Sequence, residues 1–520
     1  MRDAGLSSKA DAGPGTAASP PAQAAPRLDW TVLVPAAVTL LVMLWGLTST
    51  SYWTDEAATL SATSRTVPQL WQMLGRVDAV HGLYYFLLWP VVHLAGTGEF
   101  KTRLPSAVAM ALACAGIAVI GRRLRSRRAG LYAGLIFAIL PLVSVQGHDA
   151  RPYAFETAAA VLSSYLLVRA AQEPRWRWFA GYGLSLVLLG YLHMFGLVII
   201  AAHALTLIPA SRRGEGRRLT AGLAPRWLAL RWLALRWLAS VAGAAVLLIP
   251  LLWLGWLQRA GINWLKPPNW GTVTALGIGL GGTVTAFWLL AALAVLGAVR
   301  ADWPDGARLR VARAAWAGRD DRLLPWLALP WLVLPPAFLM AVSLIFMPVY
   351  TITYVTFCLP ALALLAGAGL AALARPVRLG ALLIAAVLVL PAQQTARGPH
   401  EEGWLRAASA LLERHERPGD AVYWLNSVPS WNIAYPDGFG RLRDISLGET
   451  AAQADRLVGP EATMPVINQR LRSVQRLWII EMRTWQNPPA TLALSPDFRI
   501  GEKLRAGNIR MWLYVRVTPP

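Results

Sequence analysis

Apolar runs of about 20 residues recur along most of this chain, and they limit its fold more than any other feature. A helix of about 20 apolar residues crosses the ~30 Å hydrocarbon core of a bilayer. The chain has 520 residues, 56% of them hydrophobic and only 15% charged. This predicts a mainly α-helical, polytopic membrane protein. The runs indicate about eleven spans, at residues 30–49, 104–120, 129–146, 154–171, 178–193, 195–210, 237–257, 280–299, 323–346, 355–374 and 379–396. For the eighth span, a broken helix over 272–299 is an alternative.

The basic residues indicate how these spans are oriented. The formal net charge is +21, but 45 of the 49 basic residues are arginine, and most lie in short loops between apolar runs. This distribution follows the positive-inside rule and argues against a nucleic-acid partner. It predicts a cytoplasmic N-terminus and an external C-terminus. It also favours an interfacial helix at Leu83–Ala95, because a spanning helix there would put the five arginines between Arg122 and Arg128 outside.

Composition divides the chain into three parts. Residues 1–27 are rich in Ala, Gly, Pro and Ser, which predicts a disordered cytoplasmic tail. Residues 28–398 are expected to form the membrane domain, and residues 399–520 a small α/β domain outside the membrane. The elements expected there are a helix at Gly403–His415 and strands at Ala421–Leu425, Leu477–Ile480 and Met511–Val515. The expected location is the cell (plasma) membrane.

Two adjacent carboxylates, Asp55 and Glu56, follow soon after the first span. Charges at a membrane boundary cost desolvation energy unless they are solvated, paired or used. The predicted topology puts further polar residues on the same outer side: Asp78, His81, His148, Asp149, Arg151, His193 and Lys266. Each has a structural alternative, which for the acids is a helix cap or a local ion pair, for the histidines a satisfied hydrogen bond, and for Lys266 a snorkelling anchor. Their common side nevertheless indicates a shared outward-facing site.

Sugar transfer from a lipid phosphate is the chemistry that would use such a set. The sugar of a membrane lipid can be reached only at the interface. The acceptor hydroxyl needs a carboxylate base, and the departing phosphate needs cationic or metal stabilisation. Acids, histidines and basic residues on one side of the membrane supply those parts.

Five short motifs carry a resemblance to a known family. They are Trp53-Thr-Asp-Glu56, Asp78-Ala-Val-His-Gly-Leu-Tyr-Tyr85, Arg103-Leu-Pro-Ser106, Gln146-Gly-His-Asp-Ala-Arg-Pro-Tyr153 and Tyr191-Leu-His-Met-Phe-Gly196. In order and spacing they resemble the GT-C glycosyltransferases that use polyprenyl-phosphate sugars, such as bacterial protein O-mannosyltransferases and lipid A aminoarabinose transferases. The resemblance covers roughly residues 30–400. It implies a GT-C fold and inverting transfer of a hexose, with mannose as the expected sugar.

The resemblance also implies roles for individual residues. Asp55 would be the general base. The residues expected to bind the donor or its phosphate are Glu56, Asp78, His81, Asp149, Arg151, His193 and Lys266. Glu56 and Asp149 are also the candidate ligands of a divalent cation, although the need for a metal stays open. One departure is Thr353, in Tyr350-Thr-Ile-Thr-Tyr354, where the family often has an arginine that approaches the lipid phosphate.

The leading hypothesis is therefore a membrane glycosyltransferase that takes a hexose from a polyprenyl phosphate. Its partners would be the lipid donor, membrane lipid, and a glycan, glycolipid or protein acceptor. A transporter or flippase of a lipid-linked sugar is the alternative from another class. It would call for polar residues along a path through the membrane, or internal repeats, and the sequence shows neither. A degenerate membrane scaffold is the third reading, and Thr353 is its main support.

Overall fold

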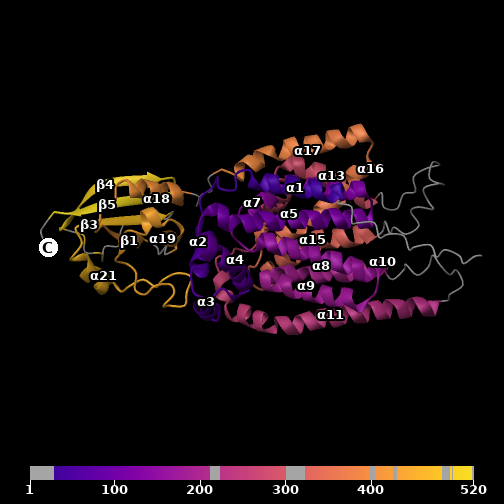
Figure 1. Ribbon diagram of the computed structural model, residues 1–520, viewed down its shortest axis with the longest axis horizontal. Helices are drawn as coiled ribbons and strands as arrows, with labels where there is room; N and C mark the ends of the chain where they lie inside the picture. Colours follow the sequence, from indigo (N-terminus) through magenta and orange to yellow (C-terminus); the bar gives the residue numbers. More distant parts are fainter. Residues whose placement is uncertain are drawn as a thin grey trace, which may run out of the picture.

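A computed structural model describes residues 29–210, 223–299, 323–398, 404–425, 430–482 and 496–517, together with Leu492 and Leu494. The predicted tail, residues 1–27, lies outside this part. The described molecule is elongated, with a helical bundle at one end and a small sheet domain at the other (Figure 1). Three short helices, α2 (Thr54–Thr63), α3 (Val67–Leu74) and α4 (Gly82–Ala95), lie where the two parts meet.

Each predicted span coincides with a helix or a bent pair of helices. The bundle consists of α1 (Trp30–Leu44), α5 (Glu99–Leu124), α6 (Arg127–Ile139), α7 (Pro141–Gly147), α8 (Tyr153–Gln172), α9 (Trp176–Leu192), α10 (Ile199–Ala210), α11 (Leu223–Leu257), α12 (Trp270–Gly281), α13 (Val284–Val299), α15 (Leu323–Ile345), α16 (Leu359–Ala372) and α17 (Arg375–Thr395). Short 3-10 turns precede α4, α10, α12 and α16: η1 (Ala79–His81), η2 (Met194–Val198), η4 (Arg259–Ile262) and η5 (Ile352–Cys358).

Helix length alone gives fewer membrane spans than the apolar runs predict. Within the described residues, six helices are long and apolar enough to cross a bilayer, and eight if each bent pair counts as one span. The pairs are α6 with α7, bent by 67°, and α12 with α13, bent by 74°. The second pair is the broken helix expected as an alternative at 272–299. The count of eleven stays a prediction, because α1 and other apolar helices are shorter than a full span.

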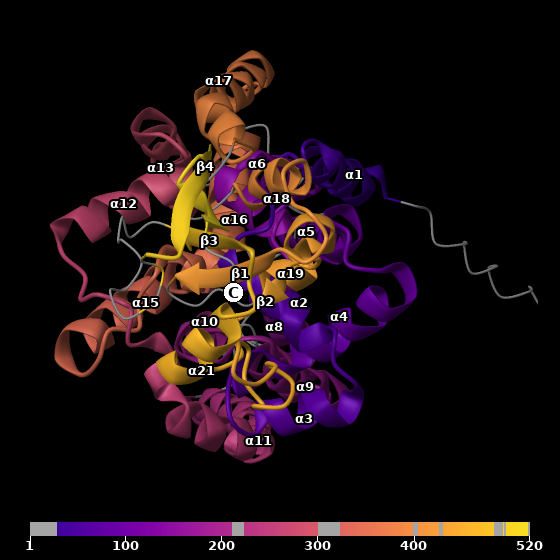
Figure 2. The same ribbon diagram turned by 90° about the vertical axis from the view of Figure 1, so that its left-hand side faces the viewer.

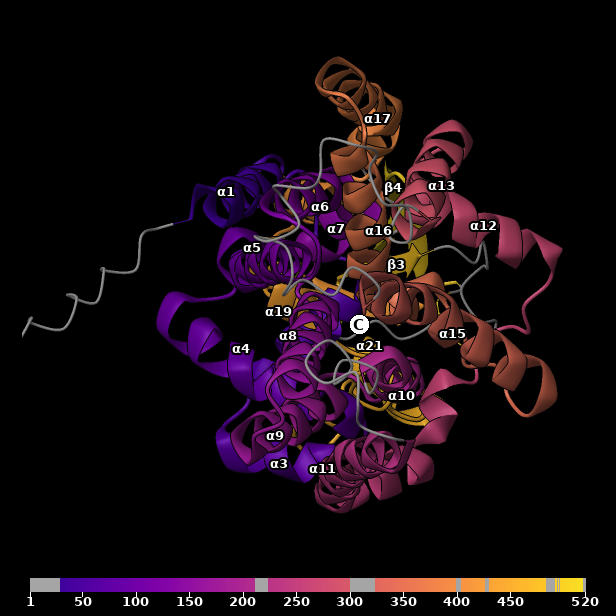
Figure 3. The ribbon, with the colours of Figure 1, turned by 90° about the vertical axis from the view of Figure 1, so that its right-hand side faces the viewer.

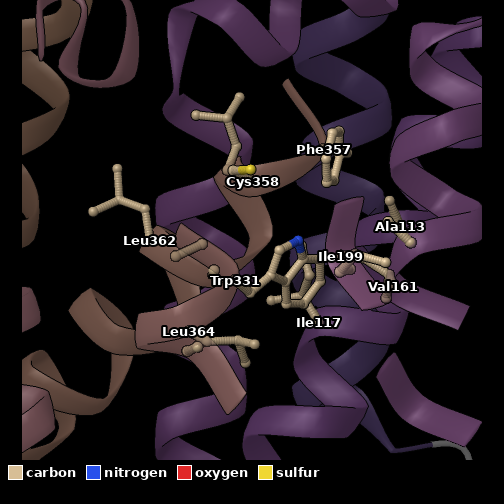
Figure 4. Close-up of a cluster of buried hydrophobic side chains, with 14 of the residues drawn as sticks. Ala113, Ile117, Val161, Ile199, Trp331, Phe357, Cys358, Leu362 and Leu364 are labelled. Carbon is tan, nitrogen blue, oxygen red and sulfur yellow. The ribbon is translucent and has the colours of Figure 1, made fainter. Parts of the chain in front are cut away.

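Small residues let the central helices of the bundle approach closely. Viewed from the end opposite the sheet domain, α16 lies between α13 and α6 (Figure 3). A Cβ atom added to Gly369 of α16 would lie 2.0 Å from the carbonyl oxygen of Leu293 in α13. Nearby, Trp331 of α15 is fully buried among side chains such as Ile117 and Ile199 (Figure 4). In a bilayer such close packing stabilises helix association, since burial of apolar surface alone gives no net gain there.

The C-terminal part forms a five-stranded sheet in the order β2-β1-β3-β5-β4. Its strands are β1 (Ala421–Leu425), β2 (Arg443–Asp444), β3 (Arg476–Met482), β4 (Phe498–Ala506) and β5 (Ile509–Arg516). β1 is parallel to β2 and β3, whereas β5 is antiparallel to β3 and β4. The accompanying helices are α18 (Leu405–Glu413), α19 (Trp431–Ala434), α20 (Pro436–Phe439) and α21 (Met464–Leu471). The predicted small C-terminal sheet is confirmed, and β1, β3, β5 and α18 lie where they were expected.

The sheet domain and the short helices share one hydrophobic core. Buried side chains of α2, α3 and α4 lie in the same cluster as those of the sheet domain, for example Leu60 and Leu70 with Trp431 and Leu405. Seen from the sheet side, α19 lies next to α2 (Figure 2). The domain is therefore packed onto the end of the bundle from which α2 projects.

Candidate functional site

Helix α2 presents Asp55 and Glu56 in its first turn. Trp53 is the N-cap residue in extended conformation, and its backbone N–H faces the Glu56 carboxylate at 3.4 Å. Two acids at this point favour the helix, because the N-terminal end of the helix dipole is positive. Their side chains then diverge in environment. The Asp55 side chain is 41% exposed, whereas Glu56 is fully buried.

Glu56 is bound on both carboxylate oxygens by the guanidinium of Arg103 in α5. The Nε of Arg103 donates to Oε1 at 2.8 Å and Nη2 donates to Oε2 at 2.6 Å. Both side chains are 1% exposed. Arg103 also donates to the carbonyl oxygens of Leu47, Thr50 and Ser51, and the backbone N–H of Ala150 donates to Glu56. The sequence reasoning assigned Arg103 no role, although an arginine beside an apolar span on the predicted outer side was the available signal.

Asp149 lies buried next to this pair. Its Oδ1 accepts a hydrogen bond from the indole N–H of Trp53 at 3.0 Å. Burial raises the pKa of Asp149 well above its usual range, and the nearby Glu56 carboxylate raises it further. Its surroundings thus disfavour the charged form of this side chain, as expected for a buried acid beside another carboxylate.

Arg151 connects Asp55 to the remaining polar residues. Its Nη2 lies 3.6 Å from Oδ2 of Asp55, and its Nη1 lies 3.4 Å from the Thr59 hydroxyl and 3.5 Å from that of Tyr85. Burial opposes the charge of Arg151, but Asp55 and neighbouring groups outweigh it and raise the pKa of the guanidinium. Its Nε is buried and has no hydrogen-bond partner among the described residues. The site thus contains a permanent cation with one donor still to be satisfied.

Asp78 and His81 complete the outer part of the cluster. Asp78 has φ 62°, a left-handed conformation that aspartate tolerates better than most residues. Its Oδ1 is 2.7 Å from Nδ1 of His81, and its other oxygen accepts from Tyr85. The Nε2 of His81 lies 3.5 Å from Arg151. These partners assign the proton to Nδ1, which leaves Nε2 as an acceptor.

The charges of this pair are set by opposing effects. Burial would raise the pKa of Asp78, but His81 and Arg151 together lower it below its usual range. Burial lowers the pKa of His81. The pKa of each group thus lies below its usual range, Asp78 because of its cationic neighbours and His81 because of burial.

His193, at the C-terminal end of α9, lies beside His81. The two imidazole rings are stacked, with centroids 6.1 Å apart. The Nδ1 of His193 is 3.1 Å from Oε1 of Glu156, a fully buried acid of α8. Tyr354, adjacent to Thr353 in η5, packs against His193 with a centroid distance of 4.7 Å. The Tyr350–Tyr354 segment thus reaches the cluster through Tyr354.

Two predicted residues lie apart from this arrangement. The Nε2 of His148 is hydrogen-bonded to the Met43 carbonyl oxygen at 2.7 Å, which fits a packing role. Lys266 is exposed, in the segment between η4 and α12. The other predicted residues lie around α2: Glu56 and Asp149 next to Arg103, and Asp55, Asp78, His81 and His193 around Arg151. The metal role of Glu56 and Asp149 stays a prediction. Arg103 binds both carboxylate oxygens of Glu56 and Trp53 binds Oδ1 of Asp149, and no group of three or more His, Cys, Asp or Glu able to hold a metal occurs in the described ranges.

The chain is similar to known glycosyltransferases in part of its sequence and to ArnT in its fold. A sequence profile described as dolichyl-phosphate-mannose-protein mannosyltransferase matches residues 82–256. No curated protein matches the chain by sequence. Two crystal structures of ArnT from Cupriavidus metallidurans, one bound to undecaprenyl phosphate and one in the apo state, each have a TM-score of 0.56 and 14% sequence identity. Each match covers 93% of this chain and 97% of ArnT. The similarity extends over both the bundle and the sheet domain.

Proposed function

We propose that this chain, a multi-pass membrane protein with the GT-C fold, is a glycosyltransferase that uses a polyprenyl-phosphate hexose. The observation that carries the proposal is the pairing of a half-exposed carboxylate, Asp55, with a buried cation, Arg151, at the end of the bundle that faces the sheet domain. A base and a phosphate-binding group are the two parts that this transfer needs. The match to the mannosyltransferase profile supports mannose as the sugar.

In the proposed reaction the acceptor hydroxyl attacks the anomeric carbon of the sugar. Its proton passes to the Asp55 carboxylate as the new C–O bond forms. The bond from the anomeric carbon to the phosphate oxygen breaks, and its electron pair stays on the departing polyprenyl phosphate. Attack opposite the leaving group inverts the anomeric configuration.

Arg151 is the residue that we propose for the departing phosphate. A guanidinium matches phosphate geometry and is charged at all relevant pH values. Its Nε–H has no hydrogen-bond partner among the described residues and would donate to a phosphate oxygen. His81 and Asp78 would hold Arg151 in place and keep water away from its guanidinium. This assignment gives Arg151 the task for which the family often has an arginine at the position of Thr353.

We further propose that transfer takes place on the outer face of the cell membrane. The charge distribution supports this orientation through the positive-inside rule. The sheet domain lies at the same end as the candidate site, so an acceptor from the cell envelope would meet both (Figure 1). A protein, a glycan and a glycolipid are all compatible with this arrangement.

The test is sugar transfer from radiolabelled polyprenyl-phosphate mannose in membranes that contain the full-length protein. Asp55→Asn should abolish transfer while the protein still inserts and folds. Asp437→Asn is the matched control, because it removes a 79% exposed carboxylate of the sheet domain whose partner is Arg441. Normal turnover by a well-expressed Asp55→Asn protein would refute the proposal. Transport of the lipid-linked sugar without transfer would favour the flippase.

A further inference from the structure

The segment just before α2 is held by the sheet domain. Nη2 of Arg406, in α18, donates to the carbonyl oxygens of Thr48 at 2.9 Å and Thr50 at 3.0 Å. The hydroxyl of Tyr435 accepts a hydrogen bond from the backbone N–H of Tyr52 at 2.8 Å. Two side chains of the C-terminal part thus bind the backbone within a few residues of Asp55.

Glu99 joins these two side chains to the bundle. It lies in the first turn of α5 and its side chain is 10% exposed. Its carboxylate accepts from Nε of Arg406 at 3.2 Å and from the Tyr435 hydroxyl. Arg406, Tyr435 and Glu99 therefore form one connected group, which we call the latch.

The latch reaches the first turn of α2 through a shared carbonyl. The Thr50 oxygen accepts from Arg406 and also from Nη1 of Arg103, at 2.8 Å. Arg103 in turn binds Glu56, the neighbour of Asp55. The other end of α2 is held as well, because the Ser61 hydroxyl donates to the carbonyl oxygen of Leu457 at 2.8 Å. The sheet domain thus contacts the segment that leads into α2 and also the C-terminal half of α2.

Asp55 depends on this backbone for its position. Within the described part of the chain, Arg151 is the ion-pair partner of its side chain, at 3.6 Å. That distance is long for a hydrogen bond, and the side chain is 41% exposed. The location of the carboxylate is therefore set chiefly by the start of α2, and the start of α2 is set by Arg103 and the latch.

We propose that Arg406 and Tyr435 are positioning residues for Asp55. The sheet domain, through the latch, fixes the segment at 48–53 and so places the carboxylate relative to Arg151. This inference rests on the proposed function for its catalytic consequence. Small displacements of a reacting group reduce rates strongly, so a partly exposed latch can matter more for turnover than for stability.

The experiment uses full-length protein in detergent and the variants Arg406→Ala, Arg406→Lys and Tyr435→Phe. Arg441→Ala is the matched control, since Arg441 also forms ion pairs at the surface of the same domain but has none with α2. Amide hydrogen exchange of residues 48–56 should speed up roughly tenfold in Arg406→Ala and Tyr435→Phe, because each variant removes contacts that hold this segment and the net contribution of one hydrogen bond corresponds to about a tenfold change. It should stay at the wild-type rate in Arg441→Ala.

Turnover supplies the second readout. In Arg406→Ala and Tyr435→Phe, kcat should fall about 10- to 100-fold, while KM for polyprenyl-phosphate mannose changes by less than about twofold. Arg406→Lys should recover part of kcat. The proposal would be overturned if residues 48–56 of Arg406→Ala and Tyr435→Phe exchanged at the wild-type rate. It would also be overturned if these residues exchanged faster while kcat stayed unchanged. If the wild-type protein transfers no sugar, the proposed function fails, whereas the exchange comparison still decides whether the latch holds the segment.

Discussion

Replacement of Glu56 by glutamine should destabilise the protein, because it removes the charge that compensates Arg103. The two side chains are 1% exposed and form hydrogen bonds of 2.8 and 2.6 Å. Loss of one partner of a buried ion pair costs ~3–5 kcal/mol. Glutamine keeps the shape but turns its amide nitrogen toward a guanidinium N–H, donor against donor. We therefore expect the free energy of unfolding to fall by ~3–5 kcal/mol.

The assay is unfolding of the full-length protein by SDS titration in mixed micelles, for Glu56→Gln, Arg103→Met and the double variant. Because the residues interact directly, the double variant should cost less than the sum of the singles, with a coupling of roughly 1.5–3 kcal/mol. Asp149→Asn is the control. It keeps an acceptor for the Trp53 indole and puts a neutral group where burial and Glu56 already disfavour a charge, so its cost should be under about 1 kcal/mol.

Two results would contradict this reasoning. One is wild-type stability in Glu56→Gln. The other is additivity of the single variants within about 0.5 kcal/mol, which is the behaviour of independent sites. Either result would mean that water or another group compensates Arg103.

Three further predictions concern pH, donor affinity and helix packing. Burial raises the pKa of Asp149 in the folded protein above its value in the unfolded chain. The stability that Asp149 contributes is therefore present at low pH and is lost as the pH rises from about 4 through the raised folded pKa. Unfolding measured as a function of pH should show this loss in the wild type and not in Asp149→Asn. Thr353→Arg should lower KM for the lipid donor about tenfold in steady-state kinetics with kcat retained, since a charge-assisted hydrogen bond contributes ~1.5–3 kcal/mol; an unchanged KM would show that the phosphate lies out of reach. Gly369→Ala should lower the free energy of unfolding by ~1–3 kcal/mol in the same SDS titration, because the added Cβ would meet the Leu293 carbonyl oxygen. Gly380 faces open space, so Gly380→Ala should leave this free energy unchanged.

Hydropathy predicted the helices well because it is a local property of the sequence. The predicted span begins at residue 104, whereas α5 itself begins five residues earlier, at Glu99. Glu99, Lys101 and Arg103 lower the local hydropathy there. Two of these charges are nevertheless accommodated, since Glu99 binds the sheet domain and Arg103 binds Glu56. Partners so distant in sequence cannot be inferred from composition.

The candidate site was only partly predictable for a similar reason. Order and spacing of short motifs indicated that Asp55, His81 and Arg151 belong together, and the structure places them in one cluster. The resemblance gave Asp55 and Glu56 different roles, but the sequence did not show that Glu56 is buried in an ion pair whereas Asp55 is half-exposed. That difference depends on Arg103, which lies 47 positions from Glu56.

The latch also has a consequence for biosynthesis. The chain is made from its N-terminus, so the segment that leads into α2 emerges early, but Arg406 follows 356 positions after Thr50. Until then, the bundle can assemble while the start of α2 lacks the contacts that fix it. We therefore expect an arrested chain without the sheet domain to insert its helices yet remain inactive. Activity would then begin only after the sheet domain has been synthesised and has bound the segment before α2.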